Sequence, residues 1–367
     1  MKKSLFLLVA AAGIVACSQS DVINMNVAEE IDTPINFTKV YLDNSTKAIT
    51  TGAYTQANFE TLGNTFGVFG YKNTATQSNY LSFNDVKVEF KTGHTVSTNG
   101  YDAVDDWEYS PLVYWDKTAT SYSFYAYAPH EGDFTGSAAL SGNTKTGFSI
   151  TGFQQATTTN SAMIDLMTDL DTHSPFAGTI GTNDVAFQFK HILSNITVRM
   201  AVSDVLKSDN TNNPVTVVSV SIGAVKMDGS YAYDTDKYEW TLASTPTTAT
   251  FNGTKTSGNV FASDALTSKT TGFTNVPGLV DLLFVPQSVD AGYKIEIQYK
   301  IKNETYDAEI LLSAFKNGSN ASLATWEPGY KYTYDIVIGP DPILFDINPT
   351  TGVAGWADGG AYEYTIN

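Results

Sequence analysis

The feature that most constrains the fold is a two-residue hydrophobic period that recurs from Ile35 onward. The longest runs of alternating apolar residues are Tyr293, Ile295, Ile297, Tyr299 and Ile301, and then Tyr330, Tyr332, Tyr334, Ile336 and Ile338. Because successive side chains of a strand point to opposite faces, this period predicts antiparallel strands with one apolar and one solvated face. The chain is therefore expected to be all-β and built from sandwiches.

A break in the pattern falls near residues 171–184, where Pro175, Gly178 and Gly181 interrupt two well-patterned halves. Each half has a comfortable domain size, so we expect two antiparallel β-sandwich domains in tandem. The predicted divisions are a signal peptide at 1–16, an acidic tether at 17–33, sandwiches at 34–178 and 179–338, and a two-strand appendage at 339–367.

The chain begins with Lys2 and Lys3, followed by an apolar run over residues 5–15. That run is shorter than the roughly 20 residues that a spanning helix needs, so it predicts a secretion signal. The small residue before Cys17 resembles the lipobox of bacterial lipoproteins, which implies cleavage before Cys17 and acylation of its thiol. The protein would then be anchored in the outer membrane by lipid. An ordinary secretion signal followed by a chance free thiol is the alternative.

Charge and cysteine usage limit the possible partners. Removing residues 1–16 takes away two lysines and no acid, which lowers the formal net charge from −17 to −19. Such a balance disfavours a nucleic-acid partner. Arg199 is the sole arginine, and Cys17 is the sole cysteine, so an intrachain disulfide is excluded.

Several blocks are similar, in their order, to the recurring blocks of fimbrillin-like proteins, the subunits of type V pili in anaerobic Gram-negative bacteria. They are residues 122–129, Asp165-Leu166-Met167, and residues 189–198, 283–287 and 326–332. The resemblance implies two transthyretin-like sandwiches, a lipoprotein precursor, and a location in a fimbrium on the cell surface. It also implies a protease that cuts after the first strand, and other fimbrial subunits as partners whose strands fill the vacated groove. It implies neither an enzyme nor a cofactor.

The sequence offers candidates for the removable strand and the cut. Residues 35–42 can form the expendable first strand, with Ile35, Phe37 and Tyr41 on one face. The candidate cleavage site is Lys47-Ala48, although the family commonly has arginine in this loop. A lysine-specific or broader protease is then required, or the chain is not cut and Lys47 is a solvated loop lysine.

The C-terminus offers a candidate donor strand. A Gly-Pro-Asp-Pro corner at residues 339–342 is followed by two short alternating runs. The candidate donor residues are Ile343, Phe345 and Ile347, and then Tyr362, Tyr364 and Ile366. Three buried large side chains and a ladder of hydrogen bonds could hold such a strand in another subunit's sandwich. In the alternative, both strands fold back onto their own second domain.

Catalytic and metal sites are not predicted. The histidines His94, His130, His173 and His191 have no partner at a working spacing, and His191 is expected to pack at a strand end. Two acidic loops, containing Asp102, Asp105, Asp106 and Glu108, and Asp228, Asp234 and Asp236, are interpreted as solvated turns rather than calcium sites.

Two function classes remain. The first is a pilus subunit that polymerises through donated strands and serves cell adhesion. The alternative is a lipid-anchored adhesin or glycan-binding protein that does not polymerise. Its sugar platforms would be the exposed aromatic residues Tyr101, Trp107, Tyr109 and Trp115.

Overall fold

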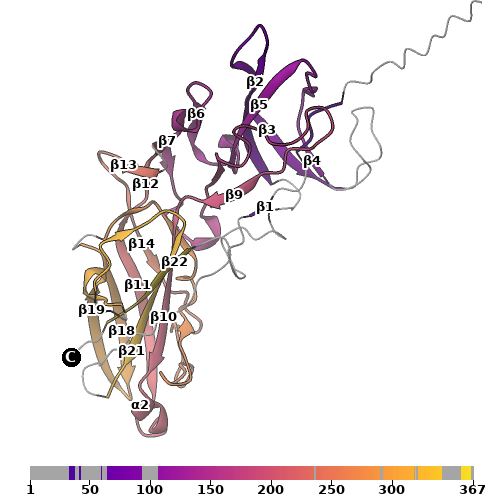
Figure 1. Cartoon of the computed structure of the whole chain (residues 1–367). Helices are drawn as coiled ribbons and strands as arrows, with labels where there is room; N and C mark the ends of the chain where they lie inside the picture. Colours follow the sequence, from indigo (N-terminus) through magenta and orange to yellow (C-terminus); the bar gives the residue numbers. More distant parts are fainter. Residues whose placement is uncertain are drawn as a thin grey trace, which may run out of the picture. The chain divides into compact units, whose positions relative to one another are not determined.

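The computed structural model describes residues 33–37, 41–42, 59, 64–92, 106–234, 237–289, 292–317, 319, 321–340 and 357–364. Within these residues strands dominate and the only α-helix longer than a turn is α2 (Asp204–Ser208) (Figure 1). Short 3-10 helices lie at Glu131–Asp133, Lys145–Gly147, Asn160–Ala162 and Leu312–Ala314. The predicted all-β class is confirmed.

The first half of the chain builds a seven-stranded sheet in the order β1-β9-β8-β5-β2-β3-β4. The bounds of its strands are β1 (Tyr41–Leu42), β2 (Thr65–Thr74), β3 (Tyr80–Lys91), β4 (Asp106–Glu108), β5 (Ala119–Ala128), β8 (Met167–Asp169) and β9 (Gln188–His191). Neighbouring strands are antiparallel, except that β1 runs parallel to β9. Strands β1 and β4 therefore stand at opposite ends of the strand order.

A second sheet combines hairpins from both halves of the chain, in the order β13-β12-β7-β6. Its strands are β6 (Thr135–Leu140), β7 (Phe148–Gln154), β12 (Asp228–Asp234) and β13 (Lys237–Leu242). Strands β7 and β12 are antiparallel, with Ile150 opposite Tyr231. Residues on both sides of the expected boundary near residue 178 thus share one sheet, and the division into two tandem domains stays a prediction.

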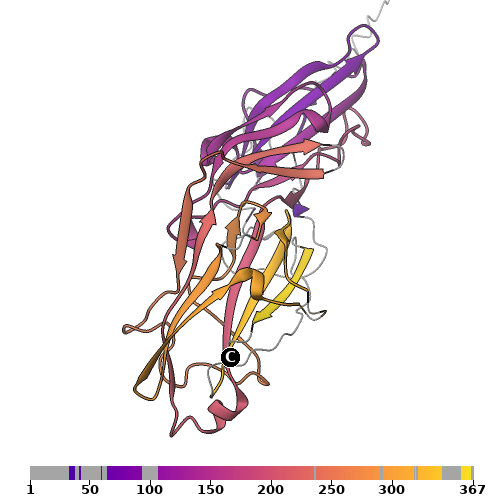
Figure 2. The same ribbon diagram turned by 90° about the vertical axis from the view of Figure 1, so that its left-hand side faces the viewer.

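Two larger sheets and one small sheet belong to the second half of the chain (Figure 2). One has the order β15-β10-β21-β22, with β16 also paired to β10, and the other has the order β14-β11-β18-β19. Strands β17 and β20 pair separately. The bounds are β10 (Ser194–Val202), β11 (Val215–Lys226), β14 (Thr248–Asn252), β15 (Thr274–Asn275), β16 (Leu282–Phe284), β17 (Gln287–Ser288), β18 (Lys294–Ile301), β19 (Glu304–Leu311), β20 (Thr325–Trp326), β21 (Tyr330–Ile338) and β22 (Ala357–Tyr364).

The first of these sheets mixes strand directions, because β21 runs parallel to both β10 and β22. Strand β22, in yellow in Figure 2, lies along β21 at the edge of the sheet. Parallel neighbours need long connections. Strands β10 and β21 are indeed far apart in the sequence, and residues 339–356 separate β21 from β22.

The predicted alternation is confirmed where one face of a sheet meets solvent. In β18, Ile295 and Ile297 are buried while Glu296 between them is exposed. The buried apolar residues form two clusters. One surrounds Phe37 within the seven-stranded sheet, and the other runs through the sheets of the second half and reaches Tyr125 of β5.

The expectation of one solvated face is wrong for β10 and β21, which are buried on both faces. Asp335 of β21 is fully buried and accepts two hydrogen bonds from the Arg199 guanidinium, each at 2.7 Å. The ring of Phe273 lies 5.5 Å from the guanidinium carbon. Burial raises the pKa of the Asp335 carboxyl above its ordinary value, although Arg199 opposes the shift. The polar side chains Arg199 and Asp335 of these strands therefore pair with each other inside the protein instead of facing solvent.

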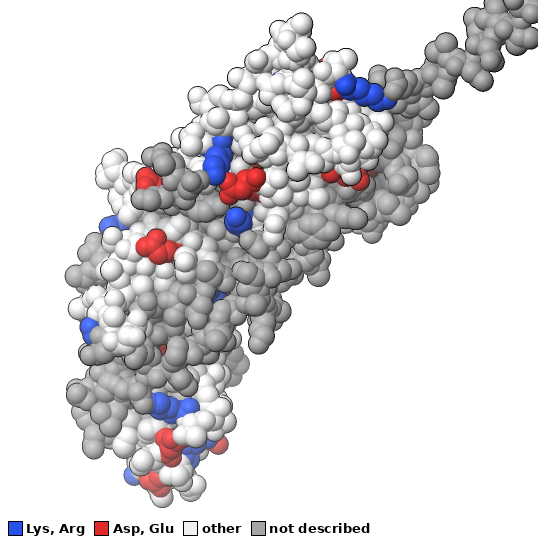
Figure 3. All heavy atoms as spheres, in the orientation of Figure 1, with Lys and Arg blue, Asp and Glu red and all other residues white. Residues whose placement is uncertain are grey.

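Charged side chains on the face drawn in Figure 3 are few and of mixed sign, with lysines lying close to acids. Among the described residues, no helix combines the length and apolar character that crossing a membrane requires.

Candidate functional site

Residues 33–37 lie alongside a second extended stretch of the chain, to which they bond in antiparallel fashion. The Ile35 amide donates to the Val113 carbonyl oxygen at 2.8 Å, and the Trp115 amide donates to the Thr33 carbonyl oxygen at 2.9 Å. The Pro34 position faces Tyr114 between these two bonds. One edge of the first segment is therefore held by backbone pairing.

The other edge of the same segment pairs with the chain that leads into β9. The Val185 amide donates to the Asn36 carbonyl oxygen at 2.9 Å, and β1 then continues parallel to β9. Phe37 bridges Trp107 of β4 on one side and Val185 on the other. Because β4 and β1 end the strand order, this segment closes the seven-stranded sheet on itself. We call the space that residues 33–37 fill the first-strand site.

Two side chains anchor the segment in the first-strand site. Ile35 and Phe37 are both 0% exposed. Five aromatic rings surround Phe37, with centroids at 5.3 to 6.3 Å, namely Phe66, Phe83, Tyr109, Phe124 and Phe187. Burial of a phenylalanine contributes roughly 1.5–3 kcal/mol, and each well-placed ring pair adds about 0.5–1.5 kcal/mol. Phe37 is thus the main apolar anchor of the first segment.

Two polar groups in the first-strand site are satisfied to different degrees. The Tyr109 hydroxyl donates to the Ile35 carbonyl oxygen at 2.7 Å and accepts from the Val113 amide at 3.2 Å. The side-chain oxygen Oδ1 of Asn36 is buried and has no hydrogen-bond partner within the described part of the chain. An unpaired buried oxygen costs about 1–3 kcal/mol. The segment is therefore well anchored at Ile35 and Phe37 and penalised at Asn36.

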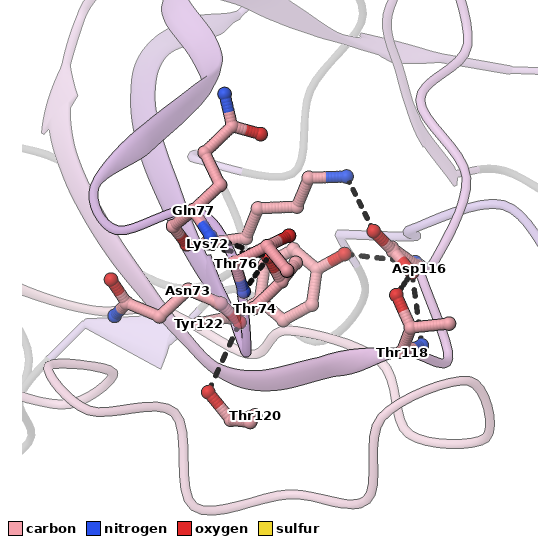
Figure 4. A network of polar contacts seen from close by, with 9 residues as sticks. All are labelled: Lys72, Asn73, Thr74, Thr76, Gln77, Asp116, Thr118, Thr120 and Tyr122. Atoms are coloured by element: carbon pink, nitrogen blue, oxygen red, sulfur yellow. Dashed lines mark hydrogen bonds and ion pairs between the residues drawn. The ribbon is translucent and has the colours of Figure 1, made fainter.

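A polar network next to Trp115 fixes the antiparallel edge of the site (Figure 4). Lys72 Nζ lies 2.7 Å from Asp116 Oδ2, and the Thr118 hydroxyl donates to Asp116 Oδ1 at 2.6 Å. The Asp116 amide donates to the Tyr122 hydroxyl at 2.8 Å. The hydrogen bond from Lys72 is the largest of the effects that lower the pKa of Asp116 to about 2. The backbone that receives the first segment is thus tied to β2 and β5.

The sequence model of the fimbrillin-like family matches residues 46–356. The chain belongs to the fimbrillin-like family. It is 25% identical over 382 residues to the fimbrium subunit Fim1C of Phocaeicola vulgatus, and the alignment covers 97% of each chain. The crystal structure of a fimbrial protein from Bacteroides vulgatus shares its fold, with 22% identity, a TM-score of 0.51 and coverage of 84% of this chain and 96% of that chain. The resemblance drawn from the sequence blocks is confirmed.

The residues that the sequence assigned to maturation of this fimbrillin-like chain are placed only in part. Ile35 and Phe37 lie in the core, and Tyr41 belongs to β1. Cys17, Lys47 and Ala48 lie outside the described residues. Lipidation and cleavage therefore stay predictions.

The candidate donor residues are likewise placed in part. Tyr362 and Tyr364 belong to β22, where their backbones stand opposite Tyr334 and Ile336. This is the arrangement expected if the second tail strand folds back onto its own chain. The remaining candidates, Ile343, Phe345, Ile347 and Ile366, lie outside the described residues.

The three described histidines contact different groups. His191 Nδ1 is 2.9 Å from Asp165 Oδ1, and both side chains are buried. Sequence reasoning placed His191 at a strand end and missed this partner, although Asp165 and His191 stand in two of the blocks that identified the family. His130 accepts from the Gly132 amide, His173 Nε2 lies 2.7 Å from the Ala186 carbonyl oxygen, and His94 lies outside the described residues.

The acidic loops are described only in part. Asp102, Asp105 and Asp236 lie outside the described residues, whereas Asp106, Glu108 and Asp234 fall at strand ends. Asp228 Oδ1 accepts from the Thr247 amide at 2.7 Å and so caps a turn. In the described ranges, no group of three or more metal-ligating side chains is found.

The aromatic residues considered as sugar platforms are mostly interior. Trp107, Tyr109 and Trp115 are 2%, 5% and 4% exposed, and Tyr101 lies outside the described residues. Their rings pack around the first-strand site, because the alternating pattern directs them inward. The interpretation of these three rings as exposed stacking platforms is wrong.

Proposed function

We propose that this chain is a lipid-anchored fimbrial subunit that polymerises by strand exchange and serves cell adhesion. The observation that carries the proposal is the position of residues 33–37, which bond to neighbours on both edges and close the seven-stranded sheet. Removing them would leave unpaired amides and carbonyls beside an apolar space lined with aromatic rings. A strand from another subunit can satisfy both at once.

A short sequence repeat supports the C-terminal tail as the replacement strand. Residues 34–37 read Pro-Ile-Asn-Phe, and residues 342–345 read Pro-Ile-Leu-Phe. Aligned in this register, Ile343 takes the position of Ile35, and Phe345 takes the position of Phe37. The tail of a second copy therefore carries the same apolar anchors at the same spacing.

The one interior difference in this repeat favours the incoming strand. At the position of Asn36, whose Oδ1 is buried and unpaired among the described residues, the tail carries Leu344. Exchange would remove a buried polar atom that costs about 1–3 kcal/mol and would put an apolar side chain in its place. This gives a thermodynamic direction to the exchange.

Cleavage at Lys47-Ala48 would make the exchange possible. Both Cys17 and the first segment lie on the N-terminal side of this bond. A single cut would therefore leave the first strand held only by non-covalent contacts and would release the main body from its lipid anchor. A membrane-bound, self-complemented precursor becomes an incomplete subunit that is ready to polymerise.

The alternative of a non-polymerising glycan-binding protein loses its main support, because three of the four rings offered as platforms, Trp107, Tyr109 and Trp115, are buried. The proposal also assigns no catalytic residue to the chain, so we propose a structural rather than an enzymatic role.

The proposal is tested with a chain that begins at Ala48 and with a synthetic peptide of residues 339–350. We expect the peptide to bind the shortened chain stoichiometrically in native mass spectrometry and to suppress its polymer ladder on non-denaturing gels. The control peptide carries Phe345→Asp, which places a charge against the aromatic pocket and should not bind. Equal binding of both peptides, or of neither, would refute the assignment of the tail to the first-strand site.

A further inference from the structure

A second cluster of buried polar residues lies where β10, β21 and the residue before β16 meet. Lys331 Nζ is 2.6 Å from Asp281 Oδ1, and the two side chains are 16% and 1% exposed. The second carboxyl oxygen, Asp281 Oδ2, is buried and has no hydrogen-bond partner in the described part of the chain. An amine and a carboxyl group are therefore held together in a largely dry environment.

The strand register holds these two groups in place. Strand β10 lies between β21 and β16, with Asn195 opposite both Lys331 and Leu283. The Asp281 amide donates to the Thr197 hydroxyl at 3.1 Å. The lysine side chain thus reaches across β10 to a carboxylate whose own backbone is fixed on the far side.

The surroundings favour the uncharged form of the Asp281 carboxyl. Burial raises the pKa of the Asp281 carboxyl above its ordinary value, and the nearby carboxylate of Asp165 adds to the shift, while Lys331 and Asn195 oppose it. A buried ion pair is costly to desolvate. Transfer of one proton from the ammonium to the carboxylate gives a neutral amine beside a neutral acid, which is the reactive combination.

We propose that Lys331 and Asp281 join in an intramolecular amide bond. The lone pair of Lys331 Nζ attacks Asp281 Cγ, so that an N–C bond forms and one Cγ–O bond breaks. The departing hydroxyl leaves as water with one proton from the nitrogen, and one proton stays as the amide N–H. The reactants and products balance without an oxidant, a reductant or a third substrate.

Asp165 acts on the reaction through the charge state of Asp281. Its carboxyl group is buried and lies 2.9 Å from His191 Nδ1, and its charge favours the uncharged form of Asp281. Condensation in water is normally unfavourable, but groups held in contact reach effective concentrations of about 10⁵–10⁸ M.

The bond would strengthen the strand that leads to the tail. It would tie β21 to the residue before β16 across β10, and β21 runs directly into the C-terminal segment. The inference goes beyond strand exchange, since the bond forms or fails to form within a single chain whether or not that chain polymerises.

Intact-mass spectrometry of the purified full-length chain tests the proposal directly. We expect a mass lower than that of the sequence by one water molecule, and after proteolysis a branched peptide that joins Lys331 to Asp281. Lys331→Arg keeps a positive partner for Asp281 but cannot form this amide, so its mass should equal that of its sequence. Wild-type protein at its full sequence mass would overturn the proposal.

A matched ion pair and one further variant complete the test. Lys294 and Glu309 lie 2.7 Å apart, but their side chains are 33% and 58% exposed, so their peptides should stay unlinked. Asp165→Asn should leave a larger fraction of folded chains at the full mass at early times after synthesis. An unchanged fraction would contradict the role given to Asp165, and a link at Lys294 would contradict the requirement for burial.

Discussion

Phe37 and Trp107 stand opposite each other in an antiparallel bridge, although Trp107 belongs to the strand at the far end of the sheet order from β1. The two rings also share a neighbour, Phe66, at centroid distances of 6.1 and 4.8 Å. The first segment is therefore a closing element of the seven-stranded sheet. Its loss would open two backbone edges and one aromatic pocket together.

Replacing Phe37 by alanine in the full-length chain should destabilise it by about 3–5 kcal/mol, the range typical of buried phenylalanines. The cost arises from lost burial and from the cavity left among the surrounding rings. Denaturant unfolding of the full-length protein measures it. Tyr80→Ala is the control, because Tyr80 is 46% exposed and its loss should change stability by no more than about 0.5 kcal/mol. Equal effects of the two variants would contradict the anchoring role of Phe37.

Replacing Asn36 by leucine should stabilise the uncut chain, by about 1 kcal/mol, because it removes a buried oxygen that has no partner among the described residues. The same change makes the first segment match the tail at this position. We therefore also expect slower polymerisation after proteolysis, measured as the time course of ladder formation. A destabilised variant that polymerises faster would show that Asn36 is satisfied in the native protein.

The titration of Asp116 should report the integrity of the edge that receives the first segment. Its pKa is lowered to about 2 from the ordinary 3.8, chiefly by Lys72. The interaction therefore stabilises the folded chain fully at pH values above 3.8. That contribution is lost as the pH falls from about 4 to about 2. NMR titration of the Asp116 carboxyl carbon should show the low value, and Lys72→Met should raise it. An unchanged value in the variant would exclude Lys72 as the cause.

Removing the guanidinium from Arg199 should cost about 3–5 kcal/mol, because Asp335 would stay buried without its partner. In Arg199→Ala the folded-state pKa of Asp335 lies above its unfolded value, so stability should rise as the pH falls through that raised pKa. The double variant Arg199→Met, Asp335→Leu should recover most of the loss. Denaturant midpoints across pH provide the comparison, and a pH-independent loss in Arg199→Ala would contradict the pairing.

The sequence predicted the fold class from its two-residue period, since sheets with one wet face leave a direct alternation, as in β18. It did not predict that β10 and β21 are buried on both faces. A buried pair such as Arg199 and Asp335 produces the same alternation of polar and apolar residues in the sequence as a solvated face does. Nor did it predict that β12 would join β7, because sheet pairing between distant hairpins depends on tertiary packing.

The sequence predicted which residues anchor the candidate site but not which parts of the chain they contact. Alternation identified Ile35 and Phe37 as one apolar face of the first strand. The bridge from Phe37 to Trp107 left no signal in the sequence, and the aromatic residues of that region were interpreted as exposed because their partners could not be seen. The burial of Trp107, Tyr109 and Trp115 follows from closure of the sheet around Phe37.

The most direct test of the central claim uses the pair Pro34 and Tyr114, which face each other at a non-hydrogen-bonded position. Such positions bring Cα atoms to about 4.5 Å, close enough for a disulfide. A chain beginning at Ala48 contains no cysteine. With Pro342→Cys and Tyr114→Cys introduced, we predict interchain disulfides that convert the polymer ladder into a covalent one on non-reducing denaturing gels. Polymers that form normally but stay unlinked would show that the tail does not occupy the place of the first strand.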